Sequence, residues 1–300
     1  MIAFWLRRIH AIFAVAALAQ YFAPYPKAAA LGIIGVFLAL HTGIVVASFM
    51  VTRRRAARTP TWPSLGSLTA ISIFLREWLA YLALYVVIQP FEQVWMGDDA
   101  SGRAPPGTIP VLLIHGYLCN RGAWWWLRRK LRANAFTTAT INLEPPLGSI
   151  DVFADQLHAR IETLCADTEA SQVSLLGHSM GGLVARAYLR KHGPARIAKL
   201  VTLASPHRGT WVAHYGIGES AREMEPGSAW MQNLQLSEPG VPTLCIWSPA
   251  DNFVVPQTSG RIESARDKMV PALGHVTELF SPLVLDILVS ELAHRSDRQR

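Results

Sequence analysis

Two hydrophobic patterns divide the chain, one in the first hundred residues and another in the remainder. The first consists of three long apolar runs, at about 9–23, 28–51 and 68–89. The second run is interrupted only by His41, Thr42 and Ser48. At about 1.5 Å per residue, a helix of this length crosses the roughly 30 Å hydrocarbon core of a bilayer. This run therefore predicts a transmembrane helix.

The other two runs are less regular. The first follows Arg7 and Arg8 and also fits a cleaved signal peptide, with Ala17–Ala19 as the cleavage triplet. The third carries Arg76 and Glu77 near its middle. Such charges cost a few kcal/mol at the bilayer centre unless they are paired or hydrated. The sequence therefore predicts two to three spans within a membrane region of residues 1–97.

The segment between the second and third runs predicts the orientation. Residues 52–58 carry four arginines, and such segments remain in the cytoplasm. A third crossing would then deliver the chain after Gln89 to the periplasm of a bacterium. We therefore predict a multi-pass protein of the inner membrane whose C-terminal domain is periplasmic.

The net charge of +7 belongs almost entirely to this membrane region. Residues 1–95 hold eight basic and two acidic side chains, whereas the remaining residues hold 20 basic and 19 acidic ones. A nearly neutral C-terminal part offers no basic patch for nucleic acid. We expect membrane lipid as a partner and no nucleic acid, and the sequence predicts no oligomeric state.

After a polar linker at 98–107, strands alternate with helices. Apolar strands are expected at 108–115, 137–143, 173–178, 197–204, 241–247 and 268–271, and helices at 121–135, 151–166, 182–191 and 276–294. This alternation predicts an α/β fold at 108–300, with a mostly parallel sheet covered by helices on both faces. Ligands of such sheets bind at the carboxyl ends of the strands.

A serine between glycines follows the third of these strands, in Gly177-His178-Ser179-Met180-Gly181. A serine in a sharp strand-to-helix turn takes a strained conformation, and glycine two residues on either side allows the chain to pack closely. The N-terminus of the following helix favours negative charge near the hydroxyl. This pattern predicts Ser179 as a nucleophile.

A serine nucleophile needs a base, and the base needs an orienting carboxylate. His275 lies just after the last strand, at the start of the last helix, and is the expected base. His207, only one strand after the nucleophile, is the alternative.

Asp251 directly follows a strand and precedes a turn, so it is the expected orienting acid. From there its carboxylate can reach the second imidazole nitrogen and fix the tautomer. Glu144 and Glu278 are weaker candidates. The predicted catalytic residues are therefore Ser179, Asp251 and His275.

A loop after the first strand supplies the remaining part of the predicted site. Gly116 allows the backbone to turn its amides inward, and His115 is expected to hold the loop by hydrogen bonds. We expect the backbone N–H groups of Tyr117 and Met180 to form an oxyanion hole. Each such donor lowers a barrier by about 3 kcal/mol.

Taken together, these motifs resemble the α/β-hydrolase superfamily and, within it, bacterial triacylglycerol lipases and esterases. In chain order they are His115-Gly116, Gly177–Gly182, Thr202–Thr210, Asp251 and Gly274-His275, and the resemblance covers about 108–293. It implies an acyl-enzyme on Ser179, activated by His275 and Asp251, without a redox cofactor. We expect no metal, because no carboxylate pair matches the structural calcium of some of these lipases.

The segment at 210–240 is expected to cap the acyl pocket. Its apolar residues, which include Trp211, Met231 and Leu234, suit an acyl chain, but they could equally pack the cap onto the core. The short insert favours a carboxylesterase over a long-chain lipase, and the membrane region suggests lipid-like esters.

Three classes of function are consistent with the sequence. The first is a membrane-anchored serine esterase or lipase, and the second is an acyltransferase that uses the same triad. The third is a binding module without catalysis, against which the complete triad argues.

Overall fold

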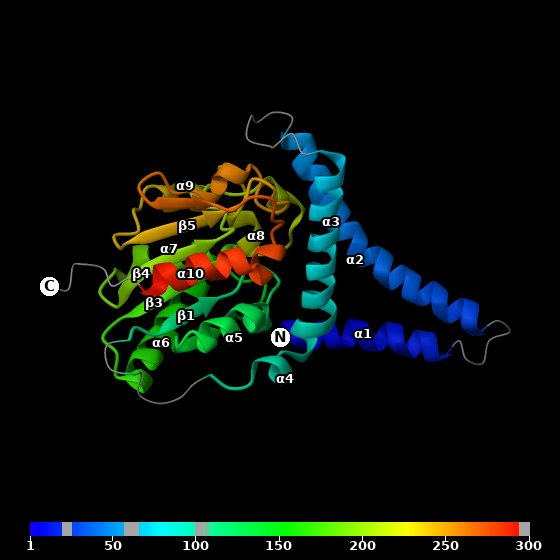
Figure 1. The fold of residues 1–300 in the computed structure, drawn as a ribbon, viewed down its shortest axis with the longest axis horizontal. Coiled ribbons are helices and arrows are strands. Elements are labelled where there is room, and N and C mark those ends of the chain that lie inside the picture. Colours follow the sequence, from blue (N-terminus) through cyan, green and yellow to red (C-terminus); the bar gives the residue numbers. More distant parts are fainter. Residues whose placement is uncertain (20–25, 57–65, 100–104, 106–107, 294–300) are drawn as a thin grey trace.

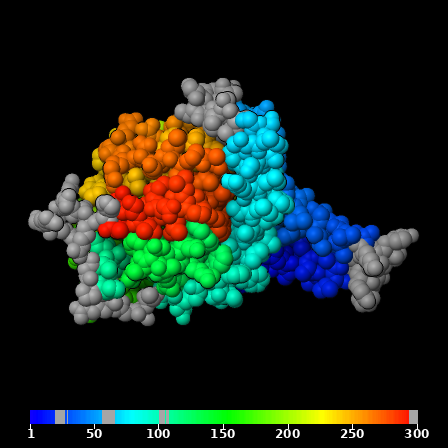
Figure 2. Space-filling model, in the orientation of Figure 1, coloured from blue at the N-terminus to red at the C-terminus, as the bar shows by residue number. Residues whose placement is uncertain are grey.

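The computed structural model describes residues 1–19, 26–56, 66–99, 105 and 108–293 of the 300-residue chain. A parallel sheet with helices on both faces forms the C-terminal domain (Figure 1). The N-terminal helices lie along one side of this domain and extend away from it (Figure 2).

The sheet has six strands in the order β2-β1-β3-β4-β5-β6, and every neighbouring pair is parallel. The strands are β1 Val111–Ile114, β2 Thr138–Ile141, β3 Val173–His178, β4 Ile197–Leu203, β5 Thr243–Trp247 and β6 Arg266–Met269. The first five are buried along their whole length, whereas β6 lies exposed at the edge and carries charged residues. This confirms the predicted parallel α/β sheet.

Helices cover both faces of the sheet. They are α5 Trp125–Ala133, α6 Ile150–Thr168, α7 Met180–His192, α8 Glu219–Glu223, α9 Ala229–Gln235 and α10 Pro282–Ala293. One hydrophobic core joins α6 and α7 to the sheet. The second core lies on the α5 and α10 side and also contains Val45, Tyr81, Leu84 and Ile88 from the N-terminal region. The two regions predicted as separate domains therefore share a core.

The predicted closing helix at 276–294 is wrong in its first third. A short 3-10 helix at Thr277–Phe280 ends at Ser281, whose backbone is extended, and α10 begins at Pro282. The physical reason is the proline, which lacks an N–H group and disfavours helical geometry in the residue before it.

Three N-terminal helices are long and apolar enough to cross a membrane by length and composition. They are α1 Ile2–Ala19, α2 Pro26–Ala56 and α3 Ser67–Leu82, the last continuing through a π segment at Ala83–Ile88 and a 3-10 turn at Gln89–Phe91 into α4 Glu92–Met96. Within the most apolar 18-residue stretch of each helix, 11% of the residues of α1 and 6% of those of α2 are buried. For the helix that begins with α3 the share is 33%. The first two helices thus project from the domain, and α3 packs against it (Figure 1).

The first residues of the predicted linker at 98–107 are bound to the C-terminal domain. The Asp99 carboxylate forms ion pairs with Arg128 at 2.7 Å and Arg160 at 2.8 Å. It also accepts hydrogen bonds from the backbone N–H and the hydroxyl of Thr140. Most of the rest of this linker lies outside the described residues.

We expect Asp99→Ala to lower the free energy of unfolding by about 2–3 kcal/mol, because it leaves the buried Arg128 guanidinium without its charge partner. A loss of this size lowers the melting temperature by roughly 5–10 °C. Thermal unfolding of the full chain in detergent measures this shift. Asp98→Ala is the matched control, since Asp98 binds Arg128 only through its backbone carbonyl. Equal melting temperatures for the two variants would contradict the prediction.

Candidate active site

Ser179 occupies the turn between β3 and α7 with an unusual backbone conformation, at φ 55° and ψ −126°. Positive φ is costly for a residue with a side chain, and such strain concentrates at functional sites. The flanking glycines allow this turn to pack. A Cβ at Gly177 would lie 2.5 Å from the Gly182 nitrogen, and one at Gly181 would lie 2.1 Å from the Ile114 carbonyl oxygen. The spacing of the motif thus has a steric cause.

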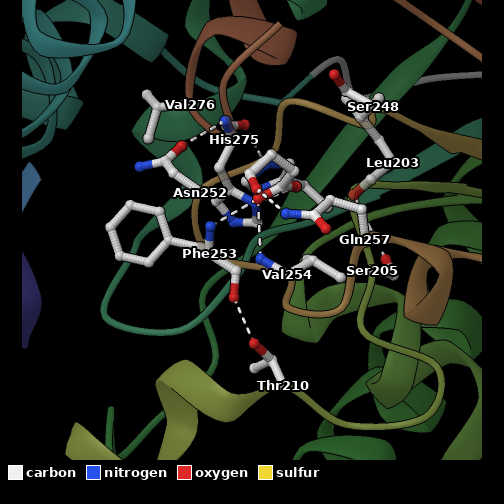
Figure 3. Close-up of polar contacts among 12 residues, drawn as sticks. Leu203, Ser205, Thr210, Ser248, Asn252, Phe253, Val254, Gln257, His275 and Val276 are labelled. Atoms are coloured by element: carbon white, nitrogen blue, oxygen red, sulfur yellow. Dashed lines mark hydrogen bonds and ion pairs between the residues drawn. The ribbon is translucent and has the colours of Figure 1, made fainter. Parts of the chain in front are cut away.

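The structure brings Asp251 and His275 together from the ends of two neighbouring strands. Asp251 follows β5 and His275 follows β6, and His275 Nδ1 lies 2.9 Å from Asp251 Oδ2. The other carboxylate oxygen accepts hydrogen bonds from the backbone N–H groups of Phe253 at 2.7 Å and Val254 at 2.8 Å. Figure 3 shows these two residues close to His275. Both carboxylate oxygens therefore have partners, which fixes the orientation of the acid.

The charges around His275 favour its protonated form. Burial lowers the pKa of His275, whereas the Asp251 carboxylate, the hydrogen bond to it and the charge of Glu77 raise the pKa. The net result is a pKa above the ordinary value of 6.5. A base of this kind is neutral only at neutral to alkaline pH, where it can accept a proton.

His275 lies beside the residue that precedes the nucleophile. Its ring centroid is 4.7 Å from that of His178 and 5.3 Å from that of Phe253. Within the part of the chain that the structure describes, neither the Ser179 hydroxyl nor His275 Nε2 forms a hydrogen bond. The Ser179–His275 contact therefore stays a prediction. In proteins without ligand, catalytic hydrogen bonds are often long and shorten when substrate binds.

The loop after β1 packs directly on Ser179. A Cβ at Gly116 would lie 2.8 Å from the Ser179 Cβ and 3.3 Å from its hydroxyl oxygen. Leu118 has a positive φ of 51°, so the loop turns sharply after Tyr117. Met180 is the first residue of α7, where backbone N–H groups lack helical acceptors. These positions suit the predicted oxyanion donors, whose role stays a prediction.

His115 is fully buried and holds this loop in place. The backbone N–H of Leu143 donates to Nε2 at 3.0 Å, so Nδ1 carries the proton and donates to the Gly116 carbonyl at 2.9 Å. Burial lowers the pKa of His115 to about 4, and the ring is therefore neutral.

The alternative base and acids lie in unsuitable surroundings. His207 is buried, its Nε2 lies 2.9 Å from the Thr202 hydroxyl, and burial lowers its pKa well below 6.5. Burial and the charges of Asp251 and Glu77 raise the pKa of Glu278 well above its ordinary value, which disfavours the carboxylate form needed to orient a base. Glu144 is partly exposed and forms an ion pair with the N-terminal amine of Met1.

Sequence reasoning missed the residues that support the acid and the base from the N-terminal helices. Asn252 accepts a hydrogen bond from the His275 backbone N–H at 3.1 Å and donates one to the Ser48 hydroxyl at 2.7 Å. Glu77 accepts hydrogen bonds from the backbone N–H groups of Val276 and Thr277. The sequence did contain a signal for Glu77, because an ionisable residue within a long apolar run indicates a functional site.

This arrangement suits one type of chemistry. A serine hydroxyl at a helix N-terminus, a histidine of raised pKa and a carboxylate on its far nitrogen are the components of nucleophilic acyl transfer.

Comparisons with known proteins agree with this geometry. A family model described as "PGAP1-like alpha/beta domain" matches residues 151–278. The triacylglycerol lipase of Pseudarthrobacter phenanthrenivorans is 30% identical over 118 residues, which cover 35% of this chain and 35% of that protein. The triacylglycerol lipase of Burkholderia plantarii is also 30% identical over 118 residues, covering 35% of this chain and 32% of that protein. The match thus spans about a third of the length of these curated relatives.

Solved structures show the same fold. Aspergillus fumigatus lipase B superposes with a TM-score of 0.60 at 20% identity, over 71% of this chain and 59% of that chain. The mature form of Bacillus licheniformis lipase BlEst2 superposes with a TM-score of 0.58 at 14% identity, over 65% of this chain and 96% of that chain. The predicted resemblance to lipases and the α/β-hydrolase fold are confirmed.

The charges around His275 generate a prediction on pH. We expect the rate at which Ser179 reacts with a fluorophosphonate to rise with pH, with a midpoint above 6.5, because His275 must lose its proton before it can act as a base. Asp251→Asn should reduce this rate by about 10⁴-fold with the fold retained. Rapid-quench labelling across pH measures both effects, with the surface variant Asp267→Asn as the control. Wild-type reactivity in Asp251→Asn would show that another carboxylate is the acid.

Proposed function

The chain has the α/β-hydrolase fold and resembles bacterial lipases and esterases, and we propose that it is a membrane-anchored serine hydrolase of carboxylic esters. The observation that carries this proposal is the 2.9 Å contact between Asp251 and His275 beside a serine held at φ 55°. A fold without catalytic function has no need of a strained serine together with a histidine that is hydrogen-bonded to a buried carboxylate.

The reaction would proceed through two transfers of one acyl group. His275 Nε2 takes the proton of the Ser179 hydroxyl while the oxygen attacks the ester carbonyl, and the backbone N–H groups of Tyr117 and Met180 bind the developing oxyanion. His275 then protonates the departing alcohol, which leaves an acyl-enzyme. Water, deprotonated by the same imidazole, releases the acid and restores Ser179.

The cap supports an apolar substrate of moderate size. Of its residues, Met224, Met231 and Leu234 are buried in the core of the domain, so they hold the cap in place. Tyr215 and Ile217 are exposed at 74% and 63%. The Tyr117 hydroxyl donates to the Ile217 carbonyl, which ties this part of the cap to the predicted oxyanion loop. We infer that lipid-like esters reach Ser179 past these exposed side chains.

An acyltransferase that uses the same three residues is the alternative activity. It differs only in the acceptor, because an alcohol would replace water in the second transfer. Product analysis with a competing alcohol separates the two activities.

We expect a fluorophosphonate to label the full chain and chromogenic esters to be hydrolysed, and both activities to disappear in Ser179→Ala. The reason is that this substitution removes the oxygen that forms the acyl bond. A series of ester chain lengths then measures the preferred acyl group. Ser171→Ala, at an exposed position, is the control. A folded wild type that the probe does not label would contradict the proposal.

The side of the membrane is a separate question. A periplasmic domain, as the sequence predicts, requires α3 to cross the bilayer. The Thr52 hydroxyl, however, donates to the Asn252 carbonyl, and the Arg55 guanidinium lies 3.9 Å above the Trp211 ring. Beyond α3, the side chain of Gln89 accepts a hydrogen bond from the Asn120 backbone N–H. These contacts support a second proposal, in which α1 and α2 cross the bilayer and α3 does not.

In this arrangement the domain lies on the same side as Arg53–Arg55, which is the cytoplasmic side by the charge rule. We expect a C-terminal fusion to green fluorescent protein to fluoresce and a fusion to alkaline phosphatase at the same position to be inactive. A phosphatase fusion after residue 22, between the end of α1 and the start of α2 in the sequence, should be active and provides the positive control. The reverse pattern at the C-terminus would restore the periplasmic prediction.

A further inference from the structure

We propose that Glu77 of α3 is a positioning residue for His275, which makes part of the membrane region a component of the active site. This inference rests on the hydrolase function proposed above. It starts from a carboxylate that is completely buried, although it belongs to an apolar helix of the N-terminal region.

The Glu77 carboxylate binds the two residues that follow His275. Its oxygens accept hydrogen bonds from the Val276 N–H at 2.9 Å, the Thr277 N–H at 2.9 Å and the Thr277 hydroxyl at 2.7 Å. Hydrogen bonds from backbone N–H groups to an ionised carboxylate are stronger than those between neutral groups. The backbone that leaves His275 is therefore fixed to α3.

The residue before His275 packs closely against the same carboxyl group. A Cβ at Gly274 would lie 2.5 Å from one Glu77 oxygen and 2.7 Å from the carboxyl carbon. A side chain at this position would displace the Glu77 carboxyl group. Glu77 thus binds the chain after the histidine and packs against the chain before it.

A second connection reaches the acid side of the pair. The side-chain amide of Asn252, the neighbour of Asp251, donates to the Ser48 hydroxyl of α2. The backbone carbonyl of Asn252 accepts a hydrogen bond from the Thr52 hydroxyl. The Asn252 side-chain oxygen also accepts a hydrogen bond from the backbone N–H of His275, as Figure 3 shows. The loops that carry the acid and the base are therefore both attached to N-terminal helices.

Glu77 also contributes its charge. The ionisable groups around the Asp251–His275 pair are Glu77 on α3, Glu278 in the 3-10 helix and His178 at the end of β3. Burial raises the pKa of Glu278 and lowers the pKa of His178, so it disfavours the charged form of each. The charges that raise the pKa of His275 are those of Asp251 and Glu77.

The test compares Glu77→Gln with Glu92→Gln in the full chain in detergent micelles. Glu92 is a matched control, because it is also a buried carboxylate that joins the N-terminal region to the domain, but it binds Asn142. We expect Glu77→Gln to lower kcat for a chromogenic ester 10- to 100-fold through misplacement of the base, with KM changed less than twofold. The midpoint of its pH profile should also move to lower pH, because the variant lacks a charge that stabilises protonated His275. Glu92→Gln should change neither quantity.

A milder variant covers the case in which Glu77→Gln does not fold, as judged by circular dichroism and gel filtration. Thr277→Val removes one donor to the carboxylate and keeps the backbone N–H, and we expect a several-fold loss of kcat. Wild-type kcat and pH midpoint in folded Glu77→Gln, or wild-type kcat in Thr277→Val when Glu77→Gln is unfolded, would overturn the inference. A wild-type chain that does not react with the fluorophosphonate would instead remove the proposed hydrolase function.

Discussion

The hydrogen bond between Asp251 and His275 is the interaction on which the rest of the site depends. It joins the loops that follow β5 and the edge strand β6, and neither residue lies in a helix or strand. The bond keeps its geometry because the surrounding backbone N–H groups, those of Phe253 and Val254, fix the carboxylate independently. Within the domain, the backbone N–H of the histidine donates to the Asn252 side chain at 3.1 Å, and His178 Nε2 lies 3.2 Å from its carbonyl oxygen. The His275 loop is held by a carboxylate that comes from the other end of the chain.

The N-terminal helices and the C-terminal domain are therefore packed together as one structure and are not merely connected by a linker. The second hydrophobic core contains residues of α2, α3 and the π segment together with residues of α5, α10 and the sheet. Asp99 continues this packing into the segment between the regions. The N-terminal helices consequently contribute to the fold of the domain as well as carrying apolar surface long enough to cross a membrane.

The sequence predicted the parts of the structure that depend on local patterns. The alternation of apolar strands and helices was sufficient for the parallel sheet, and the glycines around Ser179 were sufficient for its turn. Pro282, which causes the break before α10, was also visible in the sequence. The apolar run from Val276 nevertheless suggested one continuous helix. Here a local rule was overlooked, and no long-range contact was needed to correct the prediction.

The contacts between distant segments could not be predicted in this way. Glu77 and Val276 are 199 residues apart, and Ser48 and Asn252 are 204 residues apart. In the sequence, Glu77 was visible as a charge within an apolar run, but nothing nearby indicated what its oxygens would bind. A single sequence shows that such a residue is ionisable, but it does not show which distant groups the residue binds.

The attachment of the Asp251 and His275 loops to α2 and α3 has a consequence for regulation of the proposed activity. Helices in contact with lipid change their tilt when bilayer thickness changes, at a cost of fractions of a kcal/mol per ångström of mismatch. A change in tilt at Ser48 or Glu77 would be transmitted to the relative placement of the acid and the base. Lipid composition would then set the turnover of this protein in the manner of an allosteric effector, even for a substrate that never enters the membrane.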